Sequence, residues 1–345
     1  MKNAEKAIEW YKENEQIYGK LADEVASIIK KYLQQNNIKV YDVIKRAKSV
    51  KRFGEKAQNY SDPINEIKDV AGIRVITYLD NDRKNVVEAI KILFTIDPEN
   101  SKDYSEELGI DRIGYRGMNY VASFGKERSE LPDNEQFAGR SFEIQIMSII
   151  QHAWSELEHP SYEFKGQLPL LLERKYKLLA AILEFADSEF VTLSEKLDEY
   201  RKEIDGKLDR NELGIEIDPA SLTEYCNKRF KTFIEKGLLD PKFGNSQDGS
   251  EVVKELHDFG ILKLSQLDKI IPTDLQEKMV DSQYSGNFQA IIRFILIIKE
   301  TEKYFEHSWG KQWPLLGYRG WVLLGKYGVD LDHLKNYIEV ETEQV

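Results

Sequence analysis

Two carboxylates stand in segments whose residue patterns predict β-strands. Asp69 begins a β-branched run that continues to Leu79, and Glu143 lies in a run where apolar and polar residues alternate. A charged side chain on a half-buried strand needs a cation, and an ordinary ion pair, for example with Arg74, is one answer. The other is Mg²⁺, which is commonly held by one or two carboxylates together with substrate phosphates. The pair therefore indicates phosphoryl or pyrophosphoryl transfer.

Basic residues gather just before the first of these strands. Between Lys39 and Lys56 they greatly outnumber acidic ones, in a chain whose formal net charge is -11. A local positive field of this kind suits a polyphosphate, whereas the acidity of the whole chain argues against broad nucleic-acid binding. A solvated, Lys-rich surface is the alternative interpretation. In the first interpretation Arg46, Lys48 and Lys56 grip phosphates, and Tyr115 stacks on a base.

The strand of Glu143 leads into a helix that carries further titratable groups. Ser148 is placed to cap this helix, because the apolar residues that follow it recur at helical spacing. His152, Glu156 and His159 lie on one helical face, which offers an alternative transition-metal site in a hydrolase. Their spacing differs from the His-Glu-x-x-His pattern of zinc proteases.

Other segments predict the elements that position these residues. One long helix is expected from about Ala4 to Gln35, and Asp62-Pro63 opens a short helix that ends near Lys68. A crossover helix is expected over 86–94, and residues 114–124 predict a turn that leads into a strand. Strands that alternate with helices are typical of an α/β (α+β) domain with a mixed sheet flanked by helices.

The length of 345 residues predicts two domains. A second long helical pattern ends at about Ile204, and the composition from Gly206 to Pro219 predicts a linker. Beyond it, apolar residues again recur at helical spacing. We therefore expect a catalytic domain over residues 1–212 and a mainly α-helical domain over 213–345, with a regulatory or an oligomerisation role.

Composition narrows the class of protein. A hydrophobic content of 41% supports a folded globular chain, and the single cysteine, Cys226, excludes an internal disulfide or a cysteine-rich zinc site. The N-terminal sequence lacks the apolar core of a signal peptide. The most apolar run, 290–298, contains Arg293 and is far shorter than the ~20 residues that cross a bilayer. We expect a cytoplasmic protein that does not enter the membrane.

Four motifs, in order along the chain, resemble those of the RelA/SpoT synthetase domain. They are Arg46-Ala47-Lys48-Ser49 with Glu55-Lys56, Asp69-Val70-Ala71-Gly72-Ile73-Arg74, Gly114-Tyr115-Arg116-Gly117, and Glu143-Ile144-Gln145-Ile146 with the segment 151–159. The similarity extends over residues 40–200, and the size and layout are most similar to those of small alarmone synthetases. The resemblance implies a nucleotidyltransferase-like synthetase fold.

The resemblance also implies a reaction and a set of residue roles. The family moves the β,γ-pyrophosphate of ATP to the 3′-hydroxyl of GDP or GTP, which gives AMP and the alarmones ppGpp or pppGpp of the stringent response. Asp69 and Glu143 would hold Mg²⁺, and Glu143 would also help to deprotonate the attacking hydroxyl. ATP would be held by Arg46, Lys48, Ser49, Lys56 and Arg74. The acceptor would be held by Tyr115, Gln145, His152 and Glu158. The small synthetases are homo-oligomers, which is therefore expected here.

Departures from the family pattern keep the acceptor open. Asn119 stands where a histidine is usual, Met147 where an arginine is usual, and Arg112 is the single basic residue just before the Gly-Tyr turn. Some relatives are toxins of toxin-antitoxin or phage-defence systems, which modify adenine nucleotides or the 3′-end of tRNA. In that case tRNA is a substrate, and an antitoxin or a regulatory protein is a partner. A catalytically degraded nucleotide-binding sensor is a further alternative.

Overall fold

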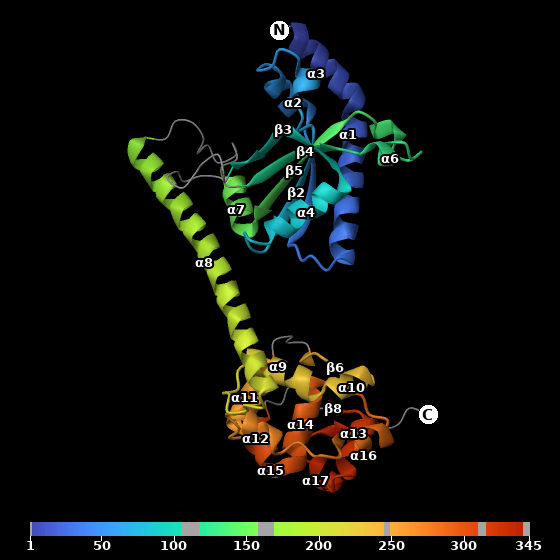
Figure 1. Ribbon diagram of the computed structural model, residues 1–345, viewed down its shortest axis with the longest axis vertical. Coiled ribbons are helices and arrows are strands. Elements are labelled where there is room, and N and C mark those ends of the chain that lie inside the picture. The colour runs from blue at the N-terminus through green and yellow to red at the C-terminus, as the bar shows by residue number, and fades with distance from the viewer. Residues whose placement is uncertain (1, 105–116, 158–168, 245–248, 310–314, 341–345) are drawn as a thin grey trace. The chain divides into compact units, whose positions relative to one another are not determined.

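The structure, a computed structural model, describes residues 2–104, 117–157, 169–244, 249–309 and 315–340. The chain divides into two compact units, Met1–Ser194 and Glu195–Val345 (Figure 1). The boundary between functional domains at residues 212 and 213 stays a prediction. No helix in the described residues is long and apolar enough to cross a membrane.

The first unit is built on a five-stranded sheet in the order β1-β2-β5-β4-β3. The strands are β1 (Asp42–Ala47), β2 (Ala71–Thr77), β3 (Thr95–Asp103), β4 (Met118–Ser123) and β5 (Ser141–Ser148). β2 and β5 run parallel, and the other neighbouring pairs run antiparallel. The mixed sheet that the sequence predicts is therefore confirmed.

The sequence did not predict β1 or β3, which form the two edges of this sheet. Val43 is the one buried residue of β1, so its polar side chains give no alternating pattern. β3 contains Pro98 and has a register shift between Asp97 and Lys102. Edge strands tolerate exposed charges, prolines and bulges because one side of their backbone has no neighbouring strand.

Helices cover one face of the sheet with an apolar layer. The described helices of this unit are α1 (Lys2–Gln35), α2 (Val50–Ala57), α3 (Pro63–Glu66), α4 (Arg83–Leu93), α6 (Lys126–Ser129), the 3-10 helix Glu135–Phe137, α7 (Ile149–Leu157) and the part of α8 (Leu170–Asp209) that precedes residue 195. Inward side chains such as Ile73 and Val75 of β2 and Ile144 of β5 are fully buried and pack in the same core as α1 and α4. The long first helix and the crossover helix are confirmed.

Cross-strand register places polar side chains on the opposite face. In the sheet, Gly72 of β2 is paired with Arg46 on one side and with Glu143 on the other. Arg74, two residues further along β2, is paired with Gln145. Directly paired residues of neighbouring strands point to the same face. The face opposite the apolar layer therefore collects polar side chains from β1, β2 and β5.

The start of α7 follows the capping pattern that the sequence predicts. The Ser148 Oγ accepts the Gln151 backbone N–H at 3.1 Å, and the Gln151 Oε1 accepts the Ser148 backbone N–H at 3.2 Å. The Ser148 hydroxyl also donates to Asp187 Oδ2 at 2.6 Å. Asp187 belongs to α8 (Leu170–Asp209), so this junction also fixes the first half of the long helix to the end of β5.

The second unit is mainly helical, as expected. Its elements are α9 (Pro219–Arg229), α10 (Lys231–Glu235), α11 (Ser250–Asp258), α12 (Leu264–Asp268), α13 (Leu275–Asp281), α14 (Phe288–Lys299), α15 (Thr301–Lys303), the π-helix Tyr304–Ser308, α16 (Tyr318–Gly325), α17 (Leu331–Leu334), and the short strands β6 (Leu239–Asp240), β7 (Gly286–Asn287), β8 (Leu315–Leu316) and β9 (Glu339–Val340). It has an apolar core of its own, centred on α14.

The linker expected from Gly206 to Pro219 is wrong in its details. Gly206 lies inside α8, which continues to Asp209. The residues that follow are held by backbone hydrogen bonds to the segment 262–265, among them Ile217 N–H to the Leu262 carbonyl at 2.9 Å. A polar, glycine-containing composition predicts a free segment, but tertiary hydrogen bonds hold this one in place.

A buried ion pair explains the charge inside the most apolar helix. The Arg293 Nε lies 3.0 Å from both carboxylate oxygens of Glu255, and the Tyr304 hydroxyl donates to the same carboxylate at 2.9 Å. Arg293 and Glu255 are 8% and 6% exposed. A buried charge is tolerated when it is paired and hydrogen-bonded, so this apolar run belongs to a protein core.

Tyr11 connects α1 to the cationic segment before β2. Its ring stacks on Phe53 of α2 with centroids 4.4 Å apart, and its hydroxyl donates to the backbone carbonyl of Lys48. Tyr11 is fully buried, and burial followed by the charge of Glu15 raises its pKa to about 12. The un-ionised hydroxyl is thus a structural donor that fixes the backbone at Lys48.

We predict that Tyr11→Phe lowers the free energy of unfolding by about 0.5–1.5 kcal/mol, because the Lys48 carbonyl loses its donor while the ring stays in place. Urea denaturation followed by tryptophan fluorescence measures the change. Tyr32→Phe, at a half-buried position of the same helix, is the matched control, with an expected change within about 0.5 kcal/mol. Equal losses in the two variants would contradict the proposed role of the hydroxyl.

Candidate active site

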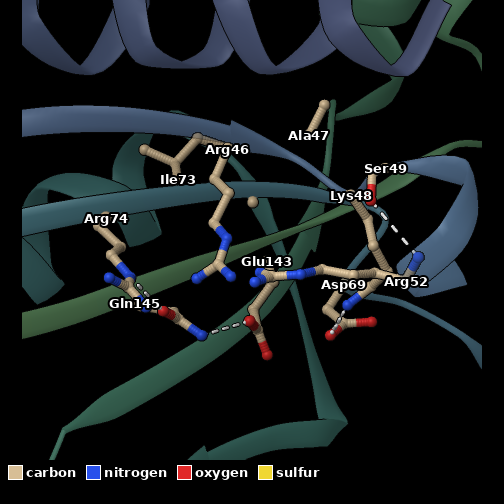
Figure 2. A pocket seen from close by; sticks show the side chains of 11 residues that line it. Arg46, Ala47, Lys48, Ser49, Arg52, Asp69, Ile73, Arg74, Glu143 and Gln145 are labelled. Carbon is tan, nitrogen blue, oxygen red and sulfur yellow. Dashed lines mark hydrogen bonds and ion pairs between the residues drawn. The ribbon is translucent and has the colours of Figure 1, made fainter. Parts of the chain in front are cut away.

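A pocket of about 320 Å³ lies where β1 ends and where β2 and β5 begin (Figure 2). Its walls come from the end of β1, the start of α2, the segment before β2, and the polar faces of β2 and β5. It is lined by Arg46, Ala47, Lys48, Ser49, Arg52, Asp69, Gly72, Ile73, Arg74, Glu143 and Gln145. The cross-strand register described above is therefore what brings the sequence-predicted residues together.

Asp69 is held by two lysines from different elements. Its Oδ2 lies 2.8 Å from the Nζ of Lys48 and 2.8 Å from the Nζ of Lys56. Burial raises the pKa of Asp69, but the charges and hydrogen bonds of the two lysines outweigh it and hold that pKa below its ordinary value. Asp69 is therefore ionised at neutral pH. The sequence offered Arg74 as an ion-pair partner for a strand carboxylate, but Arg74 pairs with Glu156 instead.

Glu143 has amide partners instead of cations. The Gln145 Nε2 donates to its Oε2 at 2.7 Å, and the Asn119 Nδ2 lies 3.4 Å from its Oε1. Burial, and then the charge of Asp69, raise the pKa of Glu143, while the hydrogen bond from Gln145 opposes them. The two carboxylates of one pocket are thus shifted in opposite directions, which is typical of sites that use acid–base chemistry.

A chain of hydrogen bonds links Glu143 to helix α7. Arg74 donates from Nε to Gln145 Oε1 at 3.0 Å, and its guanidinium forms an ion pair with Glu156 of α7. Because the Gln145 oxygen accepts from Arg74, its NH₂ group must point to Glu143. The orientation of the Gln145 amide is therefore set by Arg74, and Glu156 in turn holds the arginine.

Three arginines give the pocket its positive wall. Burial, and then the nearby charges of Arg74 and Arg52, lower the pKa of Arg46, so the three guanidinium groups act on one another within this pocket. Together with Lys48 they outnumber the carboxylates that line it. Such a cluster of cations on one wall suits a ligand with several negative charges, such as a polyphosphate.

Most of the predicted nucleotide-binding residues meet in this pocket. Lys56 is not among the residues that line it but joins it through Asp69. Ser49 lines the pocket and also caps α2, where its Oγ accepts the Arg52 N–H at 3.4 Å. Two predicted acceptor residues, Tyr115 and Glu158, lie outside the described residues. The predicted roles of all these residues stay predictions.

His152 lies on α7 and is not among the residues that line the pocket. Burial, and then the charge of Arg74, lower its pKa, so it is neutral at pH 7. The alternative transition-metal site needs His152, Glu156 and His159 together. Glu156 is already paired with Arg74, and His159 lies outside the described residues.

Two residues in contact with this site were missed by sequence reasoning. Arg52 follows Lys48 by four residues and precedes Lys56 by four, and this spacing places it on the same helical face as Lys56. That spacing was a usable signal. Asn119 contacts Glu143 across the β4–β5 pair, where it is paired with Gln145. The sequence names Asn119 only as a departure from the family pattern, and the strand pairing reveals its contact with Glu143.

Magnesium fits the carboxylates that the pocket presents. The Oδ1 of Asp69 is buried and has no hydrogen-bond partner among the described residues. The negative charge of Asp69 also raises the pKa of Glu143, because the two carboxylates repel each other. A cation bound to both would give the Asp69 Oδ1 a partner and would reduce this repulsion. In the part of the chain that the structure describes, no group of three or more His, Cys, Asp or Glu side chains forms a metal site. Mg²⁺ needs only one or two carboxylates when substrate phosphates supply further ligands.

Comparisons with known proteins agree with the position of this pocket in the chain. Residues 45–167 match the family model described as a region found in RelA / SpoT proteins. Over 135 residues the chain is 27% identical to GTP pyrophosphokinase YwaC of Bacillus subtilis (strain 168), an alignment that covers 38% of this chain and 60% of that protein. The chain thus matches less than two thirds of that relative's length.

Two solved structures are similar to this chain. Small alarmone synthetase 1 from Bacillus subtilis superposes with a TM-score of 0.47 at 22% identity, over 55% of this chain and 98% of that one. A GTP pyrophosphokinase family protein from Streptococcus pneumoniae gives 0.44 at 24% identity, over 56% and 94%. The resemblance expected from four sequence motifs is confirmed by the family model, which matches residues 45–167 of this chain.

Proposed function

We propose that this protein transfers the β,γ-pyrophosphate of ATP to the 3′-hydroxyl of GDP or GTP, in a Mg²⁺-dependent reaction that releases AMP. The observation that carries the proposal is the pair of carboxylates with opposite pKa shifts beside a wall of arginines. The family model that matches residues 45–167 and a relative named GTP pyrophosphokinase support the same reaction class.

The pocket supplies positive charge for the phosphates of ATP. Arg46, Arg52 and Arg74 line it from three different elements, and guanidinium groups bind phosphate oxygens with two parallel hydrogen bonds. In phosphoryl transfer the protein mainly orients the substrates and neutralises charge. We assign the arginine wall, with Lys48 and Lys56, to the polyphosphate. Ser49 lies beside this wall as the cap of α2.

Asp69 and Glu143 would hold Mg²⁺ in this reaction. The ion, when bound, neutralises negative charge on the pyrophosphate and on the departing AMP oxygen. The free Oδ1 of Asp69 is the oxygen available for it, since Oδ2 accepts from both lysines.

Glu143 is suited to take the proton of the attacking hydroxyl. Its raised pKa makes it a stronger base than an ordinary carboxylate, and Gln145 and Asn119 hold its orientation. In the step, the 3′-oxygen bonds to the β-phosphorus, its proton passes to the Glu143 carboxylate, and the bond from the β-phosphorus to the α–β bridging oxygen breaks. That oxygen leaves with AMP, so atoms and charges balance.

We predict that the protein converts ATP to AMP only when an acceptor is present, and that GDP and GTP are the best acceptors. Incubation of γ-³²P-labelled ATP and Mg²⁺ with GDP, GTP, ATP or tRNA, followed by separation of the products, measures this. If the label appears on tRNA or on an adenine nucleotide and not on a guanine nucleotide, that molecule is the acceptor and GDP or GTP is not. Nucleotide binding in calorimetry without AMP release from any mixture would identify a sensor.

We predict that Asp69→Asn and Glu143→Gln each lower kcat by about 100-fold or more, since each removes an ionic ligand while it keeps the side-chain shape. Initial rates of AMP release at saturating substrates measure the effect. Glu88→Gln, on the exposed side of α4, is a matched control with unchanged kcat. Near-normal turnover in either site variant would refute its assignment.

We predict that Gln145→Leu moves the acid limb of the pH profile of kcat/KM to higher pH. The Gln145 hydrogen bond lowers the pKa of Glu143, so its loss raises that pKa further, and the base form is then lost at a higher pH as the solution is acidified. Profiles from pH 5 upward compare the variant with the wild type and with Gln136→Leu, an exposed control. If the acid limb of the profile does not move in Gln145→Leu, Glu143 is not the general base.

A further inference from the structure

The carboxylate of Glu143 lies between two side-chain amides, one for each of its oxygens. Gln145 donates from Nε2 to Oε2 at 2.7 Å, as Figure 2 shows, and the Asn119 Nδ2 lies 3.4 Å from Oε1. The two amides come from neighbouring strands, since Asn119 of β4 is paired with Gln145 of β5. Directly paired residues point to the same face of a sheet, so both amides lie on the face that carries the pocket.

The two amides differ in what their oxygen atoms contact. An ionised carboxylate only accepts hydrogen bonds, so each amide turns its NH₂ group to Glu143 and its oxygen away from it. The Gln145 Oε1 accepts a hydrogen bond from Arg74 Nε at 3.0 Å. The Asn119 Oδ1 is buried and has no hydrogen-bond partner among the described residues. A buried acceptor without a donor is uncommon in folded proteins and calls for a physical explanation.

A donor group on a ligand is the explanation that fits this oxygen. A metal ion held jointly with Glu143 would need the amide oxygen of Asn119, and not its NH₂ group, to face the carboxylate. The missing partner is therefore an O–H or N–H donor that comes next to Glu143. In the proposed reaction the acceptor supplies such a donor. Its 3′-hydroxyl must reach Glu143, and the 2′-hydroxyl is the adjacent group of the same ribose.

We propose that the Asn119 Oδ1 accepts a hydrogen bond from the 2′-hydroxyl of the acceptor ribose, and that this bond makes the site select a ribonucleotide over its 2′-deoxy form. The inference rests on the proposed transfer to a ribose 3′-hydroxyl at Glu143. It does not depend on the base of the acceptor, because every ribonucleotide with a free 3′-end carries the same pair of hydroxyls. A 2′-hydroxyl is also the group by which proteins distinguish RNA from DNA.

The distances at Glu143 agree with this assignment. The oxygen and nitrogen of one amide lie ~2.3 Å apart by standard bond lengths. The Asn119 Oδ1 is therefore no more than about 6 Å from Glu143 Oε1, since its Nδ2 lies 3.4 Å from that oxygen. Two adjacent hydroxyls, with a hydrogen bond of ~2.7 Å at either end, have enough reach to span this gap. One ribose can thus contact Glu143 and Asn119 together.

The unpaired oxygen is also the source of the expected selectivity. With a 2′-deoxy acceptor the Asn119 Oδ1 stays buried without a donor, as it is in the free protein. A site that is built to bond a substrate hydroxyl rejects the analogue that lacks it, because the polar group of the site is then left unpaired. We therefore expect a preference of about tenfold or more for the ribonucleotide.

Removal of the hydroxyl from the substrate and of the amide from the protein tests the contact from both sides. AMP release by the full-length chain is measured with ATP, Mg²⁺ and either GDP or 2′-deoxy-GDP, and kcat/KM for the two acceptors is compared. In the wild type, loss of the 2′-hydroxyl is expected to lower kcat/KM about tenfold or more. In Asn119→Ala the same loss is expected to lower it by less than about twofold, because the hydroxyl then has no partner to lose.

Gln145→Leu is the matched control. It removes the other amide from Glu143, but the oxygen of that amide already has Arg74 as its partner. Both acceptors are therefore expected to react more slowly in this variant, with the ratio of their kcat/KM values unchanged. Calorimetric binding of GDP and 2′-deoxy-GDP gives the same comparison without turnover, and so covers a variant that is too slow to assay.

Each outcome decides the inference. A ratio of kcat/KM values that falls toward one in Asn119→Ala and is kept in Gln145→Leu supports it. If the wild type uses the two acceptors equally, or Asn119→Ala keeps the wild-type ratio, Asn119 does not read the 2′-hydroxyl, while reaction with GDP leaves the proposed function in place. A ratio that falls equally in Gln145→Leu assigns the preference to the position of Glu143 and overturns the role of Asn119. Absence of AMP release with GDP refutes the proposed acceptor, and this inference with it.

Discussion

The carboxylate of Asp69 is a half-buried charge that needs cations, and the way in which it obtains them organises the N-terminal unit. Lys48 comes from the end of β1 and Lys56 from α2, and both reach the same oxygen at 2.8 Å. Tyr11 then ties α1 to the backbone at Lys48. Removal of one partner from a buried ion pair costs far more than a surface pair contributes, because it leaves an uncompensated charge. The end of β1, the helices α1 and α2, and the segment before β2 are thus all connected through Asp69 at the edge of the pocket.

The contrast between the two carboxylates follows from their neighbours. Asp69 has ammonium groups, which favour its charged form, whereas Glu143 has amides and a nearby negative charge. Two carboxyl groups in one pocket therefore differ in behaviour: Asp69 stays negatively charged, and Glu143 is the stronger base. The chain from Glu156 through Arg74 and Gln145 fixes the second carboxylate without neutralising it.

Among the residues that the structure describes, those that line this pocket all precede residue 146, so none comes from the second unit. Its apolar core and the Arg293–Glu255 pair are buried by residues of the second unit itself. Its regulatory or oligomerisation role stays a prediction.

Local patterns in the sequence determined what depends on neighbours in the chain. The Ser148 cap, the long first helix, the strand of Glu143 and the four motifs were all predictable, because capping and periodicity act within a few residues. The tertiary structure decided which distant groups meet. Asp69 pairs with Lys48 and Lys56, and Arg74 pairs with Glu156 of α7. β1 becomes a strand only by pairing with β2. Asn119 reaches Glu143 only across β4 and β5. Charge pairing and strand pairing are satisfied through space, so local sequence periodicity carries no record of them.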